Sequence, residues 1–133
     1  MSVSDRIALM NAGKLEQIGV PTAIYRQPAS RFAAEFMGTT NLLQAQQLGL
    51  AAPVWLSLRP EALRFTDEAP ADWPRLEATV TRIEMLGPIS RFDVTLANGT
   101  LLRMATLDAP HRVVAVGDAV TVAYEHARLT VLR

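Results

Sequence analysis

The chain contains no cysteine, which excludes disulfide frameworks and thiolate metal sites. No apolar run approaches the roughly 20 residues that a membrane-spanning helix needs. The first residues, Met1 to Asp5, lack the basic and then apolar segments of a signal peptide. Thirteen basic residues balance thirteen acidic ones, so a surface for nucleic acid or another polyanion is not expected.

Apolar side chains, by contrast, are abundant. Half of the 133 residues are hydrophobic and a fifth are charged, which predicts a packed core rather than disorder. The length suits one domain, or one small domain with an appendage. The absence of cysteine also agrees with a cytosolic protein.

The first twenty residues predict a β-hairpin. Ile7 to Met10 is an apolar run of strand length, and Asn11-Ala12-Gly13 supplies a turn in which the glycine takes a positive φ. Lys14 to Ile18 alternates between polar and apolar residues, so Leu15 and Ile18 are expected to be buried.

Two short helices are predicted next. Pro21 suits the first turn of a helix, Pro28 interrupts the chain, and a second helix is expected from about Ala29 to a stop at Gly38. The buried face of the second helix is expected to consist of Phe32, Ala33 and Phe36, which we interpret as core packing.

From about Thr39 the pattern changes to short β segments separated by turns, which predicts a small barrel or sandwich. Leu76 to Leu86 is expected to be a long strand with a bulge near Glu84. The fold class is therefore mainly β: a small OB-like barrel or sandwich preceded by a β-hairpin and a short helical segment.

Three turns stand out in the β region. Asn98-Gly99 lies between two alternating runs, and an Asn-Gly pair predicts a two-residue hairpin because both residues tolerate positive φ. Gly87-Pro88 and Gly117-Asp118 are further turn signals.

Residues 5–38 resemble the end of the nucleotide-binding domain of ABC importer ATPases. In that family a hairpin precedes a helix in this order, and the corresponding segments here are Asp5 to Gly19 and Val20 to Gly38. The catalytic part of such an ATPase lies upstream, so the chain is expected to start too late to contain it.

The remainder is similar to the TOBE domain (transport-associated oligonucleotide/oligosaccharide-binding-like fold) of the same ATPases. The matching stretches are Leu58-Arg59-Pro60-Glu61, Thr81 to Gly87, Asn98-Gly99-Thr100, Val116 to Val120 and Leu129 to Leu132. The resemblance implies two parts: residues 1–38, a remnant of the nucleotide-binding domain, and residues 39–133, a TOBE-like domain. The stretch between Asn41-Leu42-Leu43 and Arg59 is shorter than in the family, so the fold is expected either to close with fewer strands or to borrow strands from another chain.

The chain lacks the parts that an ATPase needs. It has no glycine-rich phosphate-binding loop with Lys and Ser/Thr, no signature loop, and no switch histidine upstream of Asp5. His111 and His126 lie in the β region and cannot replace that histidine. We therefore expect a non-catalytic chain without a nucleotide, a metal or another cofactor.

Several residues raise other possible site interpretations. Arg59, Pro60 and Glu61 could contact a ligand or partner, but a structural corner is favoured. His111 and His126 have no ligand spacing for a metal, and Glu16, Glu35 and Glu61 lie on separate elements without a nucleophile. Ser and Thr side chains could bind an oxyanion, although the sequence places no helix N-terminus or glycine nest at them. The candidate structural or interaction residues are Arg59, Pro60, Glu61, Gly87, Asn98, Gly99, Gly117 and Asp118.

The resemblance implies a regulatory and dimerisation domain in the transport of a small solute. The expected partners are a second copy, with exchanged strands or hairpins, an ABC nucleotide-binding domain and permease subunits; the expected place is the cytoplasm, peripheral at the inner face of the plasma membrane. A domain that senses an oxyanion or the imported solute, and a remnant without independent function, are the alternatives. For the dimer, the apolar residues expected to need a new partner are Ile7, Leu9, Ile24, Phe32 and Phe36.

Overall fold

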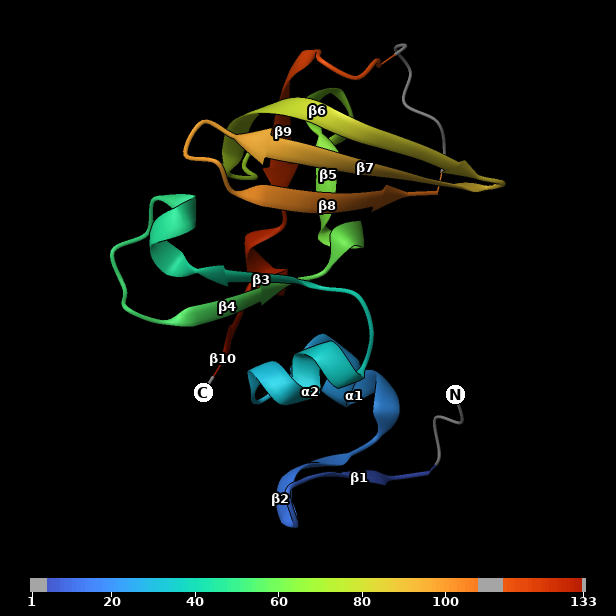
Figure 1. Cartoon of the computed structure of the whole chain (residues 1–133), viewed down its shortest axis with the longest axis vertical. Coiled ribbons are helices and arrows are strands. Elements are labelled where there is room, and N and C mark those ends of the chain that lie inside the picture. Colours follow the sequence, from blue (N-terminus) through green and yellow to red (C-terminus); the bar gives the residue numbers. More distant parts are fainter. Residues whose placement is uncertain (1–4, 108–113, 133) are drawn as a thin grey trace. The chain divides into compact units, whose positions relative to one another are not determined.

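The computed structural model describes residues 5–107 and 114–132 of the chain (Figure 1). By compactness the chain divides into two units. The first unit is Met1–Leu58 with Arg128–Arg133, and the second unit is Arg59–Ala127. The boundary expected between residues 38 and 39 concerns family relationships, and it stays a prediction.

The first unit begins with the expected hairpin. Strands β1 (Ile7–Asn11) and β2 (Lys14–Gly19) are antiparallel, and their register shifts between Leu9 and Met10. The turn places two consecutive residues at positive φ, Ala12 at 51° and Gly13 at 78°. Positive φ at both central residues is the geometry of a two-residue type I′ turn, which matches the twist of the strands. Alanine thus occupies a position that glycine or asparagine fills at lower cost.

The expected burial of Leu15 and Ile18 is wrong. Their side chains are 57% and 54% exposed, and Met10 is 54% exposed, whereas Leu9 is buried. Met10 is the cross-strand partner of Leu15, and Ile18 is the partner of Ala8. In a two-stranded sheet cross-strand partners share a face, so these apolar residues lie on the face opposite to Leu9. We call this face, made by Ala8, Met10, Leu15 and Ile18, the open hairpin face.

Both expected helices are present, α1 (Pro21–Arg26) and α2 (Arg31–Phe36). Pro21 begins α1, and the Ser30 hydroxyl caps α2 by accepting a hydrogen bond of 3.1 Å from the Ala33 amide. The Gln17 side chain secures the segment between the helices, since it accepts from the Ala29 amide at 2.9 Å and donates to the Gln27 carbonyl at 3.1 Å.

A small core holds the hairpin and helices together. Leu9, Ile24 and Ala33 are buried in it, and Ile7, Phe32 and Met37 pack against it. The expectation that Phe36 lies in the buried face is wrong, because its side chain is 63% exposed. The buried residues of α2 are Ala33 and Ala34, so the buried face is shifted by one residue from the expected face of Phe32, Ala33 and Phe36. This shift places Phe36 outside the buried face.

A three-stranded antiparallel sheet in the order β10-β4-β3 completes the first unit. Its strands are β3 (Asn41–Gln44), β4 (Trp55–Leu58) and β10 (Thr130–Leu132). Between β3 and β4, the 3-10 helix η1 (Ala45–Leu48) ends at Gly49, which has a φ of 78°. The buried Asn41 side chain donates to the Leu58 carbonyl at 3.0 Å, which ties the start of β3 to the end of β4.

The second unit is a five-stranded antiparallel sheet in the order β5-β9-β6-β7-β8. Its strands are β5 (Leu63–Phe65), β6 (Arg75–Leu86), β7 (Ile89–Leu96), β8 (Leu101–Thr106) and β9 (Ala119–Tyr124). Three 3-10 helices accompany them: η2 (Pro60–Ala62), η3 (Thr66–Glu68) and η4 (His126–Arg128). The last residue of η4, Arg128, already belongs to the first unit. The end strands β5 and β8 contact each other, so the sheet curls into a nearly closed barrel. The expected mainly β fold is confirmed. Whether strands are exchanged with another chain stays a prediction.

Aromatic and aliphatic side chains fill this barrel. Phe65 and Phe92 pack edge to face with ring centroids 5.1 Å apart, and Val80, Leu102 and Val122 are fully buried around them. Burial raises the pKa of the Tyr124 hydroxyl above its usual value, because the charged form loses hydration.

The irregularity in β6 is not where the sequence indicated. The register of β6 against β7 shifts between Val80 and Arg82, not near Glu84. At this point the backbone of Val80 turns to another partner: its N–H donates to the Asp118 carbonyl at 3.0 Å, and its carbonyl accepts from the Gly117 N–H at 2.8 Å. The bulge therefore lies where the turn before β9 meets the middle of β6.

The Asn98-Gly99 turn differs from the prediction. Leu96 and Thr100 enclose a three-residue loop: the Leu96 N–H donates to the Thr100 carbonyl, and the Gly99 N–H donates to the Leu96 carbonyl, both at 2.9 Å. Gly99 has a φ of 86°, whereas Asn98 is not at positive φ. The Asn98 side chain instead accepts from the Thr100 N–H at 3.0 Å. This is a β-turn followed by a glycine bulge, in which only Gly99 needs the left-handed region.

Replacing Ala12 with Asn should stabilise the hairpin by roughly 0.5–1 kcal/mol, because Asn tolerates positive φ better than Ala. Amide hydrogen exchange across β1 and β2 should slow by about two- to fivefold. As a matched control, Ala12→Val should accelerate the exchange, since a β-branched residue is strained in this region. Faster exchange in Ala12→Asn would contradict the type I′ assignment.

Replacing Gly99 with Val should destabilise the second unit by at least about 1 kcal/mol, measured by urea denaturation. Ala97→Val in the same loop should stay within about 0.5 kcal/mol, because Ala97 is exposed and not at positive φ. Equal effects of the two substitutions would show that positive φ at Gly99 does not matter.

Candidate functional site

The residues Arg59, Pro60 and Glu61 form a corner of the second unit. Pro60 begins the 3-10 helix η2, and the Ala62 N–H donates to the Arg59 carbonyl at 3.0 Å. Arg59 is only 4% exposed, and the Arg64 guanidinium donates to the Glu61 carbonyl. The tripeptide is thus part of the packed structure, and the choice between a structural corner and a contact for a ligand or partner stays a prediction.

The other candidate residues lie at separate turns. Gly87, with a φ of 71°, is in the turn that joins β6 to β7, and Asn98 and Gly99 are in the loop that joins β7 to β8. Gly117 and Asp118 form the turn before β9, where the Asp118 carboxylate accepts from the Ala115 N–H at 2.9 Å. Their backbone requirements account for these residues, and their role in interactions stays a prediction.

Only one of the two histidines lies in the described part of the chain. His126 lies in η4, and His111 lies outside the described residues. Within residues 5–107 and 114–132, no group of three or more His, Asp or Glu side chains could hold a metal ion. In the same ranges, no helix is both long and apolar enough to cross a membrane.

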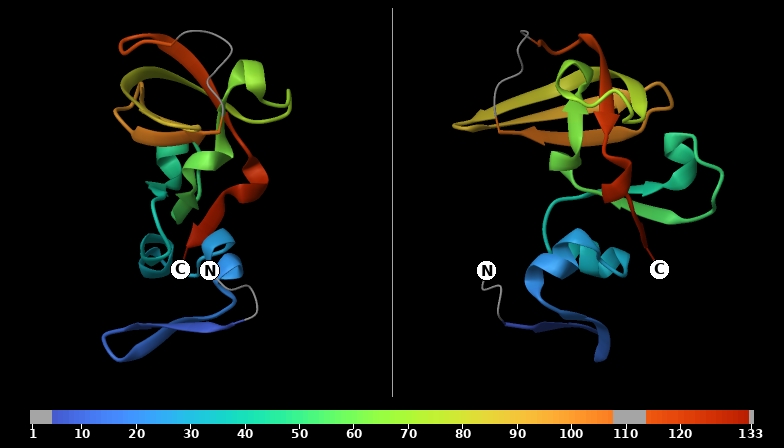
Figure 2. Two further views of the ribbon diagram at one scale, coloured as in Figure 1. Left: turned by 90° about the vertical axis from the view of Figure 1, so that its right-hand side faces the viewer. Right: turned by 180° about the vertical axis from the view of Figure 1, so that it is seen from behind.

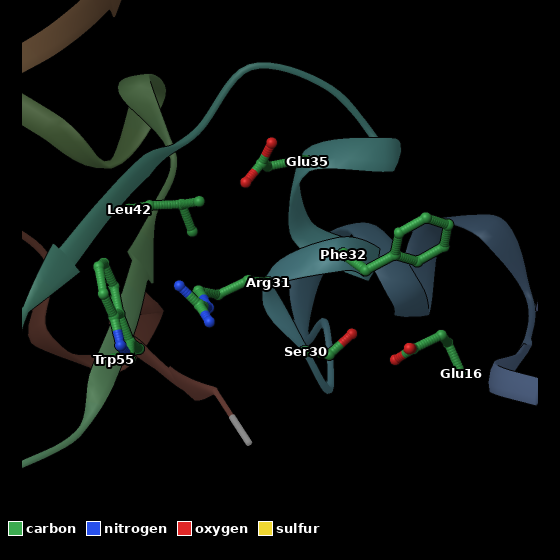
Figure 3. Close-up of a pocket in the computed structure, with 7 residues that line it drawn as sticks. All are labelled: Glu16, Ser30, Arg31, Phe32, Glu35, Leu42 and Trp55. Atoms are coloured by element: carbon green, nitrogen blue, oxygen red, sulfur yellow. The ribbon is translucent and has the colours of Figure 1, made fainter. Parts of the chain in front are cut away.

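A hollow in the first unit brings charged and aromatic residues together (Figure 3). Its volume is about 550 Å³. It lies between the hairpin and helices on one side and strands β3 and β4 on the other, and it is lined by Glu16, Ser30, Arg31, Phe32, Glu35, Leu42 and Trp55.

The main contact in the hollow joins Arg31 to Trp55. The guanidinium carbon of Arg31 lies 4.6 Å from the centroid of the indole ring, which is a cation–π contact. The Ser30 hydroxyl is engaged as the cap of α2, and Glu16 accepts from the Asn11 side chain at 3.2 Å. The hollow therefore carries a structural contact between α2 and β4, and these lining residues contain no paired nucleophile and base for catalysis.

No local sequence pattern indicates this hollow. Glu16 and Glu35 lie on separate elements, β2 and α2, but the fold of the first unit brings both to the lining of the hollow. Arg31 and Trp55 are more than twenty positions apart, so no local period connects them. An Arg next to an aromatic helix residue and a Trp at the start of a strand were the available signals.

Comparisons with known proteins agree with the resemblance seen in the sequence. The TOBE domain family matches residues 56–132. A spermidine/putrescine import ATP-binding protein of Pseudomonas aeruginosa is 33% identical over 99% of this chain and 42% of its own length. A sulfate/thiosulfate import ATP-binding protein of Chromobacterium violaceum is 34% identical over 97% of this chain and 41% of its own length.

The chain therefore spans about two fifths of the length of these relatives. Among solved structures, the molybdate-bound form of the cytoplasmic molybdate-binding protein ModG is similar with a TM-score of 0.50. The match covers 64% of this chain and 66% of that chain, at 17% sequence identity. At that identity the similarity concerns the fold, and it agrees with an OB-like barrel.

A double-mutant cycle should give a coupling energy of about 0.5–1 kcal/mol between Arg31→Leu and Trp55→Leu in urea denaturation, the size of an exposed cation–π contact. The matched control pairs Trp55→Leu with Arg26→Leu, an exposed arginine at the end of α1, and should give none. Zero coupling in the first cycle would contradict the role of the contact.

Proposed function

Because the chain belongs to the TOBE domain family, whose match covers residues 56–132, we propose that it is the non-catalytic, regulatory part of an ABC-type importer ATP-binding subunit. The observation that supports this most directly is the order of the segments. Hairpin, helices and β region align in one stretch with import ATP-binding proteins, over 99% of this chain. The chain is thus a transport-associated domain, and its regulatory role is the proposed step.

The open hairpin face supports a docking role. Three of its apolar side chains, Met10, Leu15 and Ile18, are more than half exposed. Apolar side chains gathered on one face of an exposed two-stranded sheet indicate a surface that binds protein. We propose that an ABC nucleotide-binding domain covers this face.

In this proposal the chain transmits changes between interfaces and performs no bond chemistry. One interface is with the nucleotide-binding domain, and the other is between two copies of the regulatory domain. A coupling of this kind requires only that the two interfaces have different preferred states. Nucleotide binding belongs to the nucleotide-binding domain, since the chain has no phosphate-binding loop. The complex would lie at the inner face of the membrane with its permease subunits.

The imported solute is left at the level of a small molecule. The relatives are described as importing spermidine and putrescine, which are cations, and sulfate and thiosulfate, which are anions. The charge of the solute thus differs among relatives that are similarly identical to this chain. The similarity to the molybdate-binding protein ModG does not support an oxyanion-sensing role, because at this sequence identity it shows the fold alone.

Docking is testable with the nucleotide-binding domain of the Pseudomonas aeruginosa relative, separated from its own C-terminal part. We expect the chain to bind it in isothermal titration calorimetry and Ile18→Lys to weaken binding by at least about tenfold, since a charge would be buried. Leu101→Lys, at an exposed apolar position of β8, should leave it unchanged.

The same titration with magnesium and ATP should show no binding to the chain alone. Micromolar nucleotide binding would overturn the non-catalytic assignment. Binding of the domain that is equally strong in wild type and Ile18→Lys would remove the hairpin face from the proposal.

A further inference from the structure

In the described part of the chain, strand β6 has no strand partner on one edge along its second half. Strand β9 pairs only with Arg75 to Thr79 of β6, and Val80 bonds to the Gly117-Asp118 turn. From Arg82 to Leu86, β6 pairs with β7 on one side, and in the described part of the chain no strand pairs with its other side. The ends of β6 and β7 extend as a two-stranded projection (Figure 2). An unpaired strand edge is a template for another strand.

The turn at the tip determines which backbone groups face outward. Leu86 and Ile89 are cross-strand partners around the two-residue turn Gly87-Pro88, so they form the hydrogen-bonded pair that closes the hairpin. Hydrogen-bonded and non-hydrogen-bonded pairs alternate along an antiparallel ladder. Ile83 and Met85 therefore direct their N–H and carbonyl groups away from β7, toward the open edge.

The side chains along this edge combine apolar and charged groups. Met85 is 64% exposed, Leu86 46% and Ile89 37%, so the tip is apolar and accessible. Arg82 and Glu84, two residues apart, lie on one face of the strand, with 3.3 Å between the guanidinium and the carboxylate. The segment thus carries one positive and one negative charge, symmetrically placed around Ile83.

We propose that a second copy of this chain pairs with the open edge of β6, antiparallel, around a two-fold axis at Ile83. In this register Arg82 of each copy lies opposite Glu84 of the other, and the outward groups of Ile83 bond to those of its counterpart. The other residue with outward backbone groups is Met85, and a register centred on it would place Glu84 opposite Leu86 and Arg82 opposite Pro88, without opposite-charge pairs. The charge pattern therefore favours one register, and the identical edges satisfy two-fold symmetry.

This inference rests on the dimerisation part of the proposed function, and it assigns that dimerisation to a surface. The gain comes from backbone hydrogen bonds at an otherwise open edge and from burial of Ile83, Met85 and Leu86. Exposed charge pairs contribute little affinity by themselves, so Arg82 and Glu84 mainly fix the register.

A charge-reversal cycle tests the register. Light scattering of the full chain should give about twice the monomer mass of 14.5 kDa at concentrations above the dissociation constant. Arg82→Glu and Glu84→Arg should each raise the dimer dissociation constant by about tenfold, because two like-charge pairs form per dimer. The double reversal should return it to within about threefold of wild type. Glu77→Arg, on the half of β6 that β9 covers, is the matched control and should have no effect.

A cysteine cross-link tests the axis. The chain has no cysteine, so Ile83→Cys introduces a single thiol. Hydrogen-bonded antiparallel partners have Cα atoms about 5.5 Å apart, within the range of a disulfide. Mild oxidation should convert Ile83→Cys into a covalent dimer, whereas Glu77→Cys should stay uncrosslinked.

The outcomes separate this inference from the proposed function. If the wild-type chain stays monomeric up to about 100 µM, a limit that corresponds to weak affinity, both dimerisation and edge pairing are overturned. The docking titration would still test the interface with the nucleotide-binding domain. A dimer that tolerates both single reversals and does not cross-link through Ile83→Cys would overturn the edge pairing alone.

Discussion

Backbone pairing of strand β6 is the interaction around which the second unit is organised, because β6 pairs with both β7 and β9. Its twelve residues pair with β7 along most of their length. On the other side, β9 covers only the first half, and the Gly117-Asp118 turn takes the last bonds at Val80. The bulge at Val80 lies where this second pairing ends, and beyond it no strand of the described residues pairs with this edge of β6.

In the described part of the chain, the first unit also has a surface without a partner, but this surface consists of apolar side chains and not of backbone groups. The hairpin buries Leu9 against the helices but exposes Met10, Leu15 and Ile18 on its other face. A two-stranded sheet has two faces, and the small helices α1 and α2 cover one of them. Among the described residues, the first unit thus has an exposed apolar sheet face and the second unit a strand edge without a strand partner. These surfaces differ in chemistry and suit two different partners.

Local chemistry made much of the chain predictable. Pro21 and Pro28 bound the helices because proline fixes φ and lacks an N–H, and the alternation through Phe92 and Val94 produces β7. The positions of the turns were predictable from the sequence, but the turn types were not. Ala12-Gly13 adopts the two-residue geometry expected at Asn98-Gly99, because loop length depends on how the flanking strands pair.

The sequence by itself determined the mainly β class and the order of hairpin, helices and β region, since these depend on periodicity and turn residues. It determined the family through stretches that resemble known relatives, and the family match agrees. Only the tertiary structure decided which apolar residues are exposed, where β6 bulges and that Arg31 meets Trp55. These features depend on which face of an element finds a neighbour. The choice between the two faces of a hairpin or the two edges of a strand is made by contacts between residues far apart in the chain, which no local pattern encodes.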